Sequence, residues 1–553
     1  MTRRVLIVGG VAGGASAAAR LRRLDERAEI VLFDRGPHVS FANCGLPYYV
    51  GDVITDERRL LVASRELFRD RFNIDVQTEH EVTGIDRATQ TVRVKDLRAG
   101  AEHDEHYDVL VLAPGAAPIR PAARGLDLPG VFVVRTIPDT QRIRAWLEER
   151  PRREAVVVGG GFIGLEMAEN LVRRGLEVTV LEKLPQVMPP VDPEMAAEIA
   201  RHLRTEGVQL RLGEGFSDIE PATGDRLAVR TDRDATITTD LVILALGVRP
   251  EAALAQAAGL AIGARGGIVV DERMRTSDPK IYAVGDAVEV RDVIIGQEII
   301  LPLAGPANRQ GRVAAEAIAG RWARFRGVQA TAIVSVLDLT VATTGASEKG
   351  LRRAGVTDFG AIYLHPGHHA GYYPGATPIH LKLLYSREDG RILGAQAVGQ
   401  EGIDKRIDVI ATMIQMRGTV HDLAEVELCY APQFGAAKDP INIAGMMAAN
   451  ALRGDMPLAD WTQVGRRGAV LLDVREPDEF AHGHLEGAVN LPLSELRRRI
   501  DDVPRGREIW VYCAAGQRAY YAQRLLMQLG LDVKNLSGGF TTYTMMREAG
   551  LLP

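Results

Sequence analysis

The sequence has few cysteines, no long apolar run and no strong excess of charge of either sign. Three cysteines in 553 residues, Cys44, Cys429 and Cys513, exclude a small secreted fold held by disulfides and favour a reducing compartment. No run approaches the roughly 20 apolar residues that cross a bilayer. The formal net charge of -5 gives no reason to expect nucleic acid or an anionic membrane as a partner. We therefore expect a cytoplasmic protein of three or four domains, and we predict no metal site.

Glycine, in contrast, is abundant, and its first cluster is typical of a dinucleotide-binding unit. VLIVGGVAGGASAAAR predicts a buried strand, a glycine turn and a helix, with IVLFD as the next strand. The N–H groups of such a turn hold a pyrophosphate, and an acid about 20 residues further on accepts hydrogen bonds from a ribose. Val11 replaces the middle glycine of the G-x-G-x-x-G pattern. The residues expected at the cofactor are Gly9, Gly10, Ala12, Gly13, Gly14, Asp34 and Arg35.

The same N-terminal stretch imitates a secretory signal, because it has an arginine pair, apolar residues and small residues. A strand, turn and helix would use the residues on both sides of the supposed cleavage point. This second interpretation excludes the signal peptide.

A second glycine cluster matches the dinucleotide pattern in full. Gly159, Gly161 and Gly164 follow the strand AVVVG, and EVTVLE forms the next strand. The acid that ends it, Glu182, suits the free 2′-hydroxyl of NADH, although Lys183 beside it leaves NADPH open. The predicted contacts of this unit are Gly159, Gly161, Phe162, Ile163, Gly164, Glu182 and Lys183.

Two such units followed by the segment IYAVGDAVEV, with Asp286 after its strand, resemble the flavoprotein reductases with two dinucleotide-binding domains. The resemblance covers residues 1 to about 450. It implies FAD on the first unit, NAD(P)H on the second and Asp286 at the flavin's ribityl chain. VLVLAPGAAP and LVILALGVRPE would be the crossovers between domains, with Pro114, Gly115 and Gly247 near the cofactors.

SFANCGLPYY places a single cysteine, Cys44, where many of these reductases have a C-x4-C dithiol. The position of the second sulfur is Tyr49, so Cys44 would cycle through a sulfenic acid or a mixed disulfide with a small thiol. NADH oxidases and peroxidases use the sulfenic acid, typically with a histidine where this chain has Ala12. The S-F-x-x-C-G pattern instead resembles the coenzyme A disulfide reductases.

That second resemblance implies further site residues. Tyr372 and Tyr430 match the tyrosines that a partner subunit brings to the cysteine, where a phenol can protonate a leaving thiolate. A ligand with a 3′-phosphate and a pyrophosphate needs cationic donors. The residues that match the coenzyme A pocket are Ser16, Arg20, Arg23, Ser40, Asn43, Arg71, Asn308 and Lys438.

The last hundred residues resemble a single rhodanese domain. They contain LLDVRE, GHLEGAVN and a C-x4-R loop from Cys513 to Arg518. Such a loop points N–H groups at the sulfur, and a helix N-terminus and Arg518 favour the thiolate. We expect Cys513 to carry sulfane sulfur as a persulfide. An inactive module used for contacts is the alternative.

The predicted fold class is α/β, with two Rossmann-like dinucleotide-binding domains, an α+β dimerisation domain and a C-terminal α/β rhodanese domain. The expected boundaries are 1–149 with 268–325 for FAD, 150–267 for NAD(P)H, 326–452 for dimerisation and 460–553 for the rhodanese. We expect a homodimeric, FAD-dependent reductase of coenzyme A persulfide, polysulfide and coenzyme A disulfide. An NADH oxidase or peroxidase and a redox-sensing scaffold are the alternatives.

Overall fold

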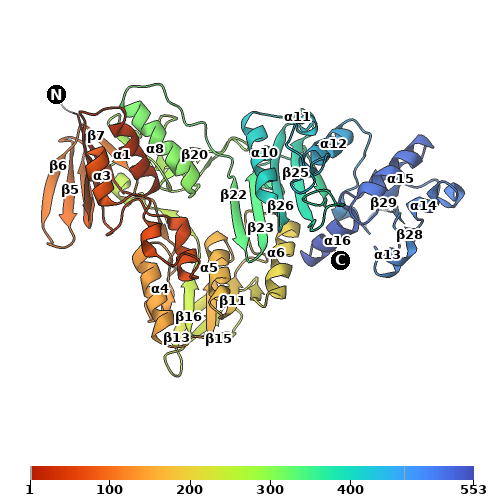
Figure 1. Ribbon diagram of the computed structural model, residues 1–553, viewed down its shortest axis with the longest axis horizontal. Helices are drawn as coiled ribbons and strands as arrows, with labels where there is room; N and C mark the ends of the chain where they lie inside the picture. Colours follow the sequence, from red (N-terminus) through yellow and green to blue (C-terminus); the bar gives the residue numbers. More distant parts are fainter. Residues whose placement is uncertain (1–2, 466–467, 553) are drawn as a thin grey trace. The chain divides into compact units, whose positions relative to one another are not determined.

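The computed structural model describes residues 3–465 and 468–552. The chain divides into two compact units, one of Met1–Lys183 with Glu214–Val328 and one of Leu184–Gly213 with Gln329–Pro553. Figure 1 follows the chain through both by colour. Segment 184–213 is grouped with the second of these units. No helix among the described residues is long and apolar enough to cross a membrane.

The first unit contains a parallel sheet of near-continuous apolar strands in the order β19-β7-β1-β2-β3. Because both faces of a parallel sheet are covered, its strands are apolar throughout: Val5, Leu6 and Ile7 have no exposed surface. Helix α1 packs against α8, where Gly311 lies so close to the Gly13 carbonyl that a side chain has no room. The elements are β1 (Arg4–Val8), α1 (Ala12–Arg22), β2 (Glu29–Asp34), α3 (Arg65–Phe72), β3 (Asp75–Thr78), β7 (Val109–Leu112), β19 (Ile281–Ala283) and α8 (Ala304–Ile318).

The second glycine turn belongs to another parallel sheet of this unit. Strands β11, β10, β16 and β9 are neighbours in that order. Two helices, α4 and α5, accompany these strands in Figure 1. The elements are β9 (Val131–Phe132), α4 (Ile137–Glu149), β10 (Glu154–Val158), α5 (Phe162–Arg173), β11 (Glu177–Glu182) and β16 (Leu241–Leu244).

Smaller sheets and short helices complete the first unit. The predicted crossovers pair with each other as β8 (Ala116–Pro118) and β17 (Val248–Pro250), with Val248 opposite Pro118. The remaining elements are α2 (Leu46–Val50), β4 (His80–Asp86), β5 (Thr91–Asp96), β6 (Glu102–His106), β13 (Phe216–Pro221), β14 (Leu227–Thr231), β15 (Thr236–Thr239), α7 (Ala253–Ala257), β18 (Ile268–Val269), β20 (Val288–Arg291) and β21 (Glu298–Ile299), with short 3-10 turns at Asn43–Gly45 and Glu57–Leu60.

The second unit is built on an antiparallel sheet in the order β22-β23-β26-β25-β24. Strand β26 lies at its centre and is buried along most of its length. The elements are α6 (Pro193–Thr205), β12 (Gln209–Leu212), β22 (Ala332–Val336), β23 (Leu339–Gly345), α9 (Glu348–Arg353), β24 (Phe359–Leu364), β25 (Ile379–Ser386), β26 (Ile392–Gly399), α10 (Ile403–Gln415), α11 (Val420–Glu425) and α12 (Pro440–Leu452).

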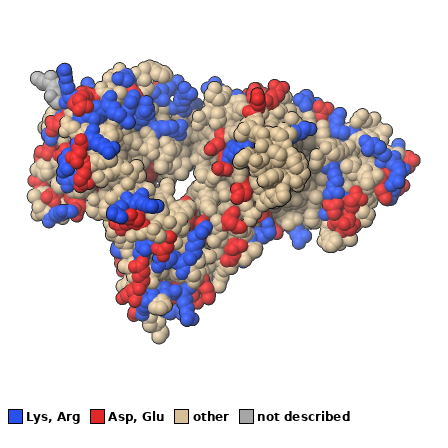
Figure 2. All heavy atoms as spheres, viewed as in Figure 1, with Lys and Arg blue, Asp and Glu red and all other residues tan. Residues whose placement is uncertain are grey.

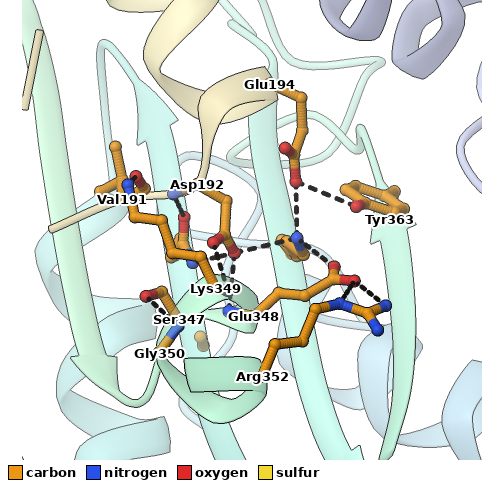
Figure 3. Close-up of polar contacts among 12 residues, drawn as sticks. Val191, Asp192, Glu194, Ser347, Glu348, Lys349, Gly350, Arg352 and Tyr363 are labelled. Atoms are coloured by element: carbon orange, nitrogen blue, oxygen red, sulfur yellow. Dashed lines mark hydrogen bonds and ion pairs between the residues drawn. The ribbon is translucent and has the colours of Figure 1, made fainter. Parts of the chain in front are cut away.

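A buried lysine, Lys382, joins α6 and α9 to this sheet. Figure 3 shows its partners Asp192, Glu194 and Glu348 directed toward one another. Lys382 Nζ donates to Asp192 Oδ2 at 2.9 Å, Glu194 Oε1 at 2.6 Å and Glu348 Oε2 at 2.8 Å. These three carboxylates are close enough together to hold a metal ion, but the ammonium group lies among them. The phenol of Tyr363 also donates to Glu194, at 3.0 Å. The cluster therefore satisfies a charge that would be costly to bury alone.

The predicted rhodanese segment forms a parallel sheet in the order β28-β27-β29-β30. Tyr363 of β24 packs into its apolar core with Trp461 and Trp510, and the Tyr363 N–H donates to Ser537 Oγ at 2.8 Å. The elements are β27 (Val470–Asp473), α13 (Pro477–Ala481), β28 (Val489–Asn490), α14 (Leu493–Leu496), β29 (Ile509–Tyr512), α15 (Gln517–Gln528), β30 (Val533–Asn535) and α16 (Gly539–Glu548), with 3-10 turns at Trp461–Gln463 and Ile500–Asp502. The predicted fold class is confirmed.

Candidate active site

The first glycine turn brings the backbone close to itself where β1 meets α1. Gly9 has φ +96° and faces the Ala113 carbonyl, and Gly14 packs on the Gly9 carbonyl. A side chain at either position would collide with backbone. The Gly10 N–H donates to Asp34 Oδ2 at 2.8 Å. The turn therefore leaves the start of α1 open to a phosphate, as the spacing predicts.

The second turn repeats this geometry where β10 meets α5. Gly159 has φ +110°, and Gly164 packs against its carbonyl. A side chain at Gly161 would meet nothing within 4 Å, so this side of the turn is open to a ligand. The Gly160 N–H donates to Glu182 Oε2 at 2.7 Å. Phe162 and Ile163 begin α5, and Lys183 is exposed beside Glu182.

A cavity of about 1770 Å³ lies within the first unit. It exceeds the roughly 300–1,000 Å³ of an ordinary small-molecule site, so it has room for more than one such ligand. Of the predicted FAD residues, its wall includes Gly9, Ala12, Gly13, Asp34, Arg35, Pro114, Gly115 and Asp286. Of the predicted coenzyme A residues and thiols, it includes Ser16, Arg20, Arg23, Ser40, Asn43, Cys44 and Asn308.

The carboxylates and glycines of this cavity fit a dinucleotide with hydroxyl groups. Burial raises the pKa of Asp34, although the Gly10 and Gly36 N–H groups oppose this effect. Burial also raises the pKa of Asp286. Hydroxyl donors of a ribose or a ribityl chain would satisfy both carboxyl groups, because buried acceptors need partners. Arg35, in contrast, pairs with Glu251 at 2.8 Å.

Cys44 is exposed in the turn before α2. Burial by the surrounding protein raises its pKa, and the negative charges of Glu166 and Asp286 raise it further. The nearby Ser40 has φ +47°, a strained conformation for a residue other than glycine, and its N–H donates to the Gly10 carbonyl at 2.7 Å. The thiol therefore faces an open cavity with no cation among the groups that shift its pKa.

Some of the predicted coenzyme A residues line the cavity and others do not. Ser16 and Asn308 hydrogen bond to each other between α1 and α8, and Arg20 pairs with Glu316. Figure 2 shows Lys and Arg side chains gathered over the region of α1 and α8. Arg71, however, is exposed on α3 and is not among the residues that line the cavity, and Lys438 is exposed in the second unit.

Sequence reasoning missed several residues of this site. Tyr48 donates to Glu166 at 3.4 Å. Burial raises the pKa of Glu166 to about 7, and burial and Glu166 raise that of Tyr48 to about 12. Arg135 and Arg312 also line the cavity. The only sequence signal for Glu166 is an acid inside the apolar stretch FIGLEMA. The signal for Arg312 is its position one helical turn after Asn308, a predicted coenzyme A residue.

Tyr49, where a dithiol enzyme would have its second sulfur, is directed elsewhere. Its hydroxyl lies 3.2 Å from Glu57, and Arg144 lies over its ring at 4.5 Å. The structure thus leaves Cys44 without a second sulfur from that position.

The two predicted catalytic tyrosines, Tyr372 and Tyr430, meet in the second unit. The hydroxyl groups of Tyr372 and Tyr430 are 2.7 Å apart, and the residues are 75% and 48% exposed. The hydrogen bond to Tyr430 raises the pKa of Tyr372. These phenols are therefore paired on a surface, with their rings accessible to another molecule.

Cys513 lies in the tight loop between β29 and α15. It is 2% exposed, and its sulfur accepts a hydrogen bond from the Gly516 N–H at 3.2 Å. Gly516 has φ +99°, which favours glycine. The Cys513 carbonyl accepts from the Phe540 N–H at 2.7 Å. The predicted loop geometry, with an N–H directed at the sulfur, is present.

Family models match the chain in three successive segments. Residues 3–311 match the pyridine nucleotide-disulphide oxidoreductase model. The chain belongs to this family. Residues 331–439 match its dimerisation domain, and residues 460–546 match the rhodanese-like domain. The family uses FAD with NAD(P)H, and the chain is an oxidoreductase.

Known proteins are similar along most or all of the chain. The coenzyme A disulfide reductase of Staphylococcus haemolyticus is 34% identical over 81% of this chain and 99% of its own. An NADH oxidase of Methanocaldococcus jannaschii is 37% identical over 80% and 97%. The crystal structure of reduced Bacillus anthracis CoADR-RHD has a TM-score of 0.97 with 46% identity, covering 99% of both chains. A NAD-dependent persulfide reductase from A. fulgidus has a TM-score of 0.90 with 39% identity over 98% of this chain and 100% of its own.

Proposed function

We propose that the protein reduces coenzyme A persulfide, polysulfide and coenzyme A disulfide with electrons from NADH. One observation carries this proposal: a lone, exposed Cys44 lies on a cavity whose wall contains residues of both the predicted FAD site and the predicted coenzyme A site. The match to the persulfide reductase over 98% of the chain supports it. When bound, FAD would pass two electrons from NAD(P)H to a disulfide at Cys44.

The reaction at Cys44 begins as a thiol–disulfide exchange. The Cys44 thiolate attacks the carbon-bound sulfur of coenzyme A persulfide, a bond forms between the two sulfurs, and hydrosulfide leaves. With coenzyme A disulfide, the same attack releases coenzyme A thiolate. Two electrons from NADH then restore the Cys44 thiolate and free coenzyme A. Coenzyme A persulfide and NADH thus give coenzyme A, hydrosulfide and NAD⁺.

We propose that a homodimer completes the site. Residues 331–439 match a dimerisation domain, and the exposed pair Tyr372 and Tyr430 would come from the partner subunit, as the family resemblance implies. Their shared proton could protonate the leaving thiolate. The free thiols of all three cysteines support a cytoplasmic location.

Cys513 would receive sulfane sulfur and transfer it to coenzyme A. The loop N–H at its sulfur supports this role, because it stabilises a negative charge there. A reductase of coenzyme A disulfide alone has no need of such a carrier. The rhodanese-like domain therefore favours persulfide or polysulfide as the main substrate.

Two variants test this division of function. Cys44→Ser should abolish NADH consumption with coenzyme A disulfide and with polysulfide. Cys513→Ser should leave the first activity intact and weaken the second, since only sulfane sulfur needs the carrier. Equal loss of both activities in Cys513→Ser would contradict the proposal.

An NADH oxidase or peroxidase is the second candidate, and the relative from M. jannaschii favours it. It would use Cys44 as a sulfenic acid. Mass spectrometry of the non-reduced protein separates the two: a coenzyme A adduct on Cys44 supports the reductase, and an adduct-free Cys44 with rapid peroxide turnover supports the oxidase.

A further inference from the structure

The cation of the Cys513 loop is already bound to a carboxylate. Arg518 Nη1 donates to Glu479 Oε2 and Arg518 Nη2 donates to Glu479 Oε1, both at 2.6 Å. This paired geometry is the strong form of the arginine–carboxylate interaction. Glu479 raises the pKa of Arg518, and Cys513 beside it raises that pKa further. The arginine of this loop is therefore part of a neutral pair with Glu479.

No other side chain of the loop offers a positive charge. From Cys513 to Arg518 the sequence is CAAGQR, so Ala514, Ala515 and Gln517 are uncharged. The Arg475 guanidinium lies over the Phe540 ring at 4.3 Å, but it is bound to Asp473 at 2.6 Å and to the Gly483 carbonyl at 2.6 Å. Its side chain is 5% exposed. Neither arginine is free for a doubly charged anion.

Glu479 is also fixed in place. Its Oε2 accepts the Glu476 N–H at 3.1 Å, which completes a capping box at the start of α13. The hydrogen bond to Arg518 lowers the pKa of Glu479 to about 2. The carboxylate therefore remains charged at any pH near neutrality.

We propose that Glu479 selects the sulfur donor of Cys513: it neutralises Arg518, so that the loop accepts sulfane sulfur from organic persulfides and rejects the thiosulfate dianion. A dianion that leaves water needs cations in return, and the one cationic side chain between Cys513 and Arg518 is already paired with Glu479. A persulfide presents one terminal sulfur with at most one charge. This selectivity rests on the sulfur-carrier role proposed above.

The accepted step is a transfer of one sulfur atom. The Cys513 thiolate attacks the terminal sulfur of a persulfide R–S–SH. The bond between that sulfur and R–S breaks, Cys513–S–SH forms, and R–S⁻ leaves. With cyanide as acceptor, Cys513–S–SH returns to the thiol and thiocyanate is released. No external oxidant or reductant is required.

The test uses the full-length flavoenzyme without NADH, so that only sulfur transfer to cyanide is measured. The donors are sodium thiosulfate and pantetheine persulfide. Glu479→Gln keeps an acceptor for the Glu476 N–H and removes the charge. Ala515→Lys adds a cation to the loop and leaves the ion pair intact. Asp478→Asn is the matched control, because it removes an exposed carboxylate from the same helix.

Wild-type protein should prefer pantetheine persulfide in kcat/KM by about a hundred-fold or more, as two lost charge-assisted hydrogen bonds would imply. Glu479→Gln should raise kcat/KM for thiosulfate about ten-fold, mainly through KM, and change the persulfide value less than about two-fold. Ala515→Lys should act in the same direction, and Asp478→Asn should resemble the wild type.

Equal use of both donors by the wild type would overturn the selectivity. Unchanged thiosulfate turnover in both Glu479→Gln and Ala515→Lys would also overturn the selectivity. Circular dichroism of each variant confirms that it has the native fold. NADH consumption with coenzyme A disulfide, measured on the same preparations, keeps this outcome separate from the proposed function. That activity should persist in all three variants even if the selectivity fails.

Discussion

The two thiols assigned to chemistry, Cys44 and Cys513, have opposite surroundings. Cys44 is exposed on the wall of a large cavity, and burial with two nearby acids raises its pKa. Cys513 is 2% exposed and accepts an N–H from its own loop. At Cys513 the chain thus directs a backbone N–H at the sulfur. At Cys44 it supplies space and negative charge.

This difference indicates how each site becomes active. The N–H donor at Cys513 belongs to the backbone, so it is in place as soon as the domain folds. The acidic environment at Cys44 opposes a thiolate until a bound ligand changes it. We infer that the reductase thiol depends on its ligands, whereas the sulfur-transfer thiol depends on the fold around it.

The largest expected effect destabilises the second unit, which contains Cys513. Lys382→Met should lower the free energy of unfolding of the second unit by about 3–5 kcal/mol, because it leaves three largely buried carboxylates without their cation. Urea denaturation should show this loss, with faster alkylation of Cys513 as a local readout. Lys405→Met, at a lysine 3.9 Å from Asp439, is the control and should cost less than about 1 kcal/mol. A loss of FAD affinity as large as the loss of stability would show that the effect is not confined to the second unit.

The next prediction compares the access of an alkylating reagent to Cys44 and to Cys513. In reduced, ligand-free protein, iodoacetamide should modify Cys44 about a hundred-fold faster than Cys513, because a buried thiol reacts only after local opening. Peptide mass spectrometry over time gives both rates, and exposed Cys429 serves as an internal reference. Denaturation should remove the difference. Comparable rates in the native protein would mean that the Cys513 loop opens freely.

A smaller effect tests the loop glycine. Gly516→Ala places a side chain at φ +99°, which costs about 1–2 kcal/mol and turns the N–H away from the sulfur. Sulfur transfer to cyanide should fall about ten-fold, and coenzyme A disulfide reduction should not change. Gly530→Ala, also at positive φ (+80°) but in open space, should lose similar stability and keep sulfur transfer. If both variants lose transfer equally, strain and not the N–H is responsible.

Features set by local spacing could be predicted from the sequence. In both glycine turns the last glycine packs on a carbonyl five residues earlier, Gly14 on Gly9 and Gly164 on Gly159, so this contact depends on local spacing. Gly9 and Gly159 themselves face carbonyls far along the chain, those of Ala113 and Ala245. The C-x4-R loop is likewise local, because its six residues alone set the spacing of Cys513 and Arg518. Family models match the predicted sequence of reductase, dimerisation and rhodanese segments.

Features made by distant segments could not be predicted. Glu166 reaches the surroundings of Cys44 only because α5 packs against α2, and Glu479 meets Arg518 across 39 residues of chain. The run TAIVSVLDLTVATTG is apolar or β-branched almost throughout. It nevertheless turns at Leu337, with φ +61°, between β22 and β23. No glycine or asparagine marks that hairpin. Lys382 gave no signal either, because its partners lie 34 to 190 residues away.

The smallest expected effect concerns the ionisation of Cys44. Glu166 is second only to burial among the causes that raise the Cys44 pKa, and its own pKa is about 7. As the pH rises through 7, Glu166 loses its proton, and its negative charge then opposes formation of the Cys44 thiolate at higher pH. Glu166→Gln removes that charge and keeps a partner for the Tyr48 hydroxyl, so alkylation of Cys44 should reach its half-maximal rate at a lower pH. The alkylation of Cys429, in the other unit, should keep its pH profile. An unchanged profile for Cys44 would mean that burial, and not the neighbouring carboxylate, sets the ionisation of this thiol.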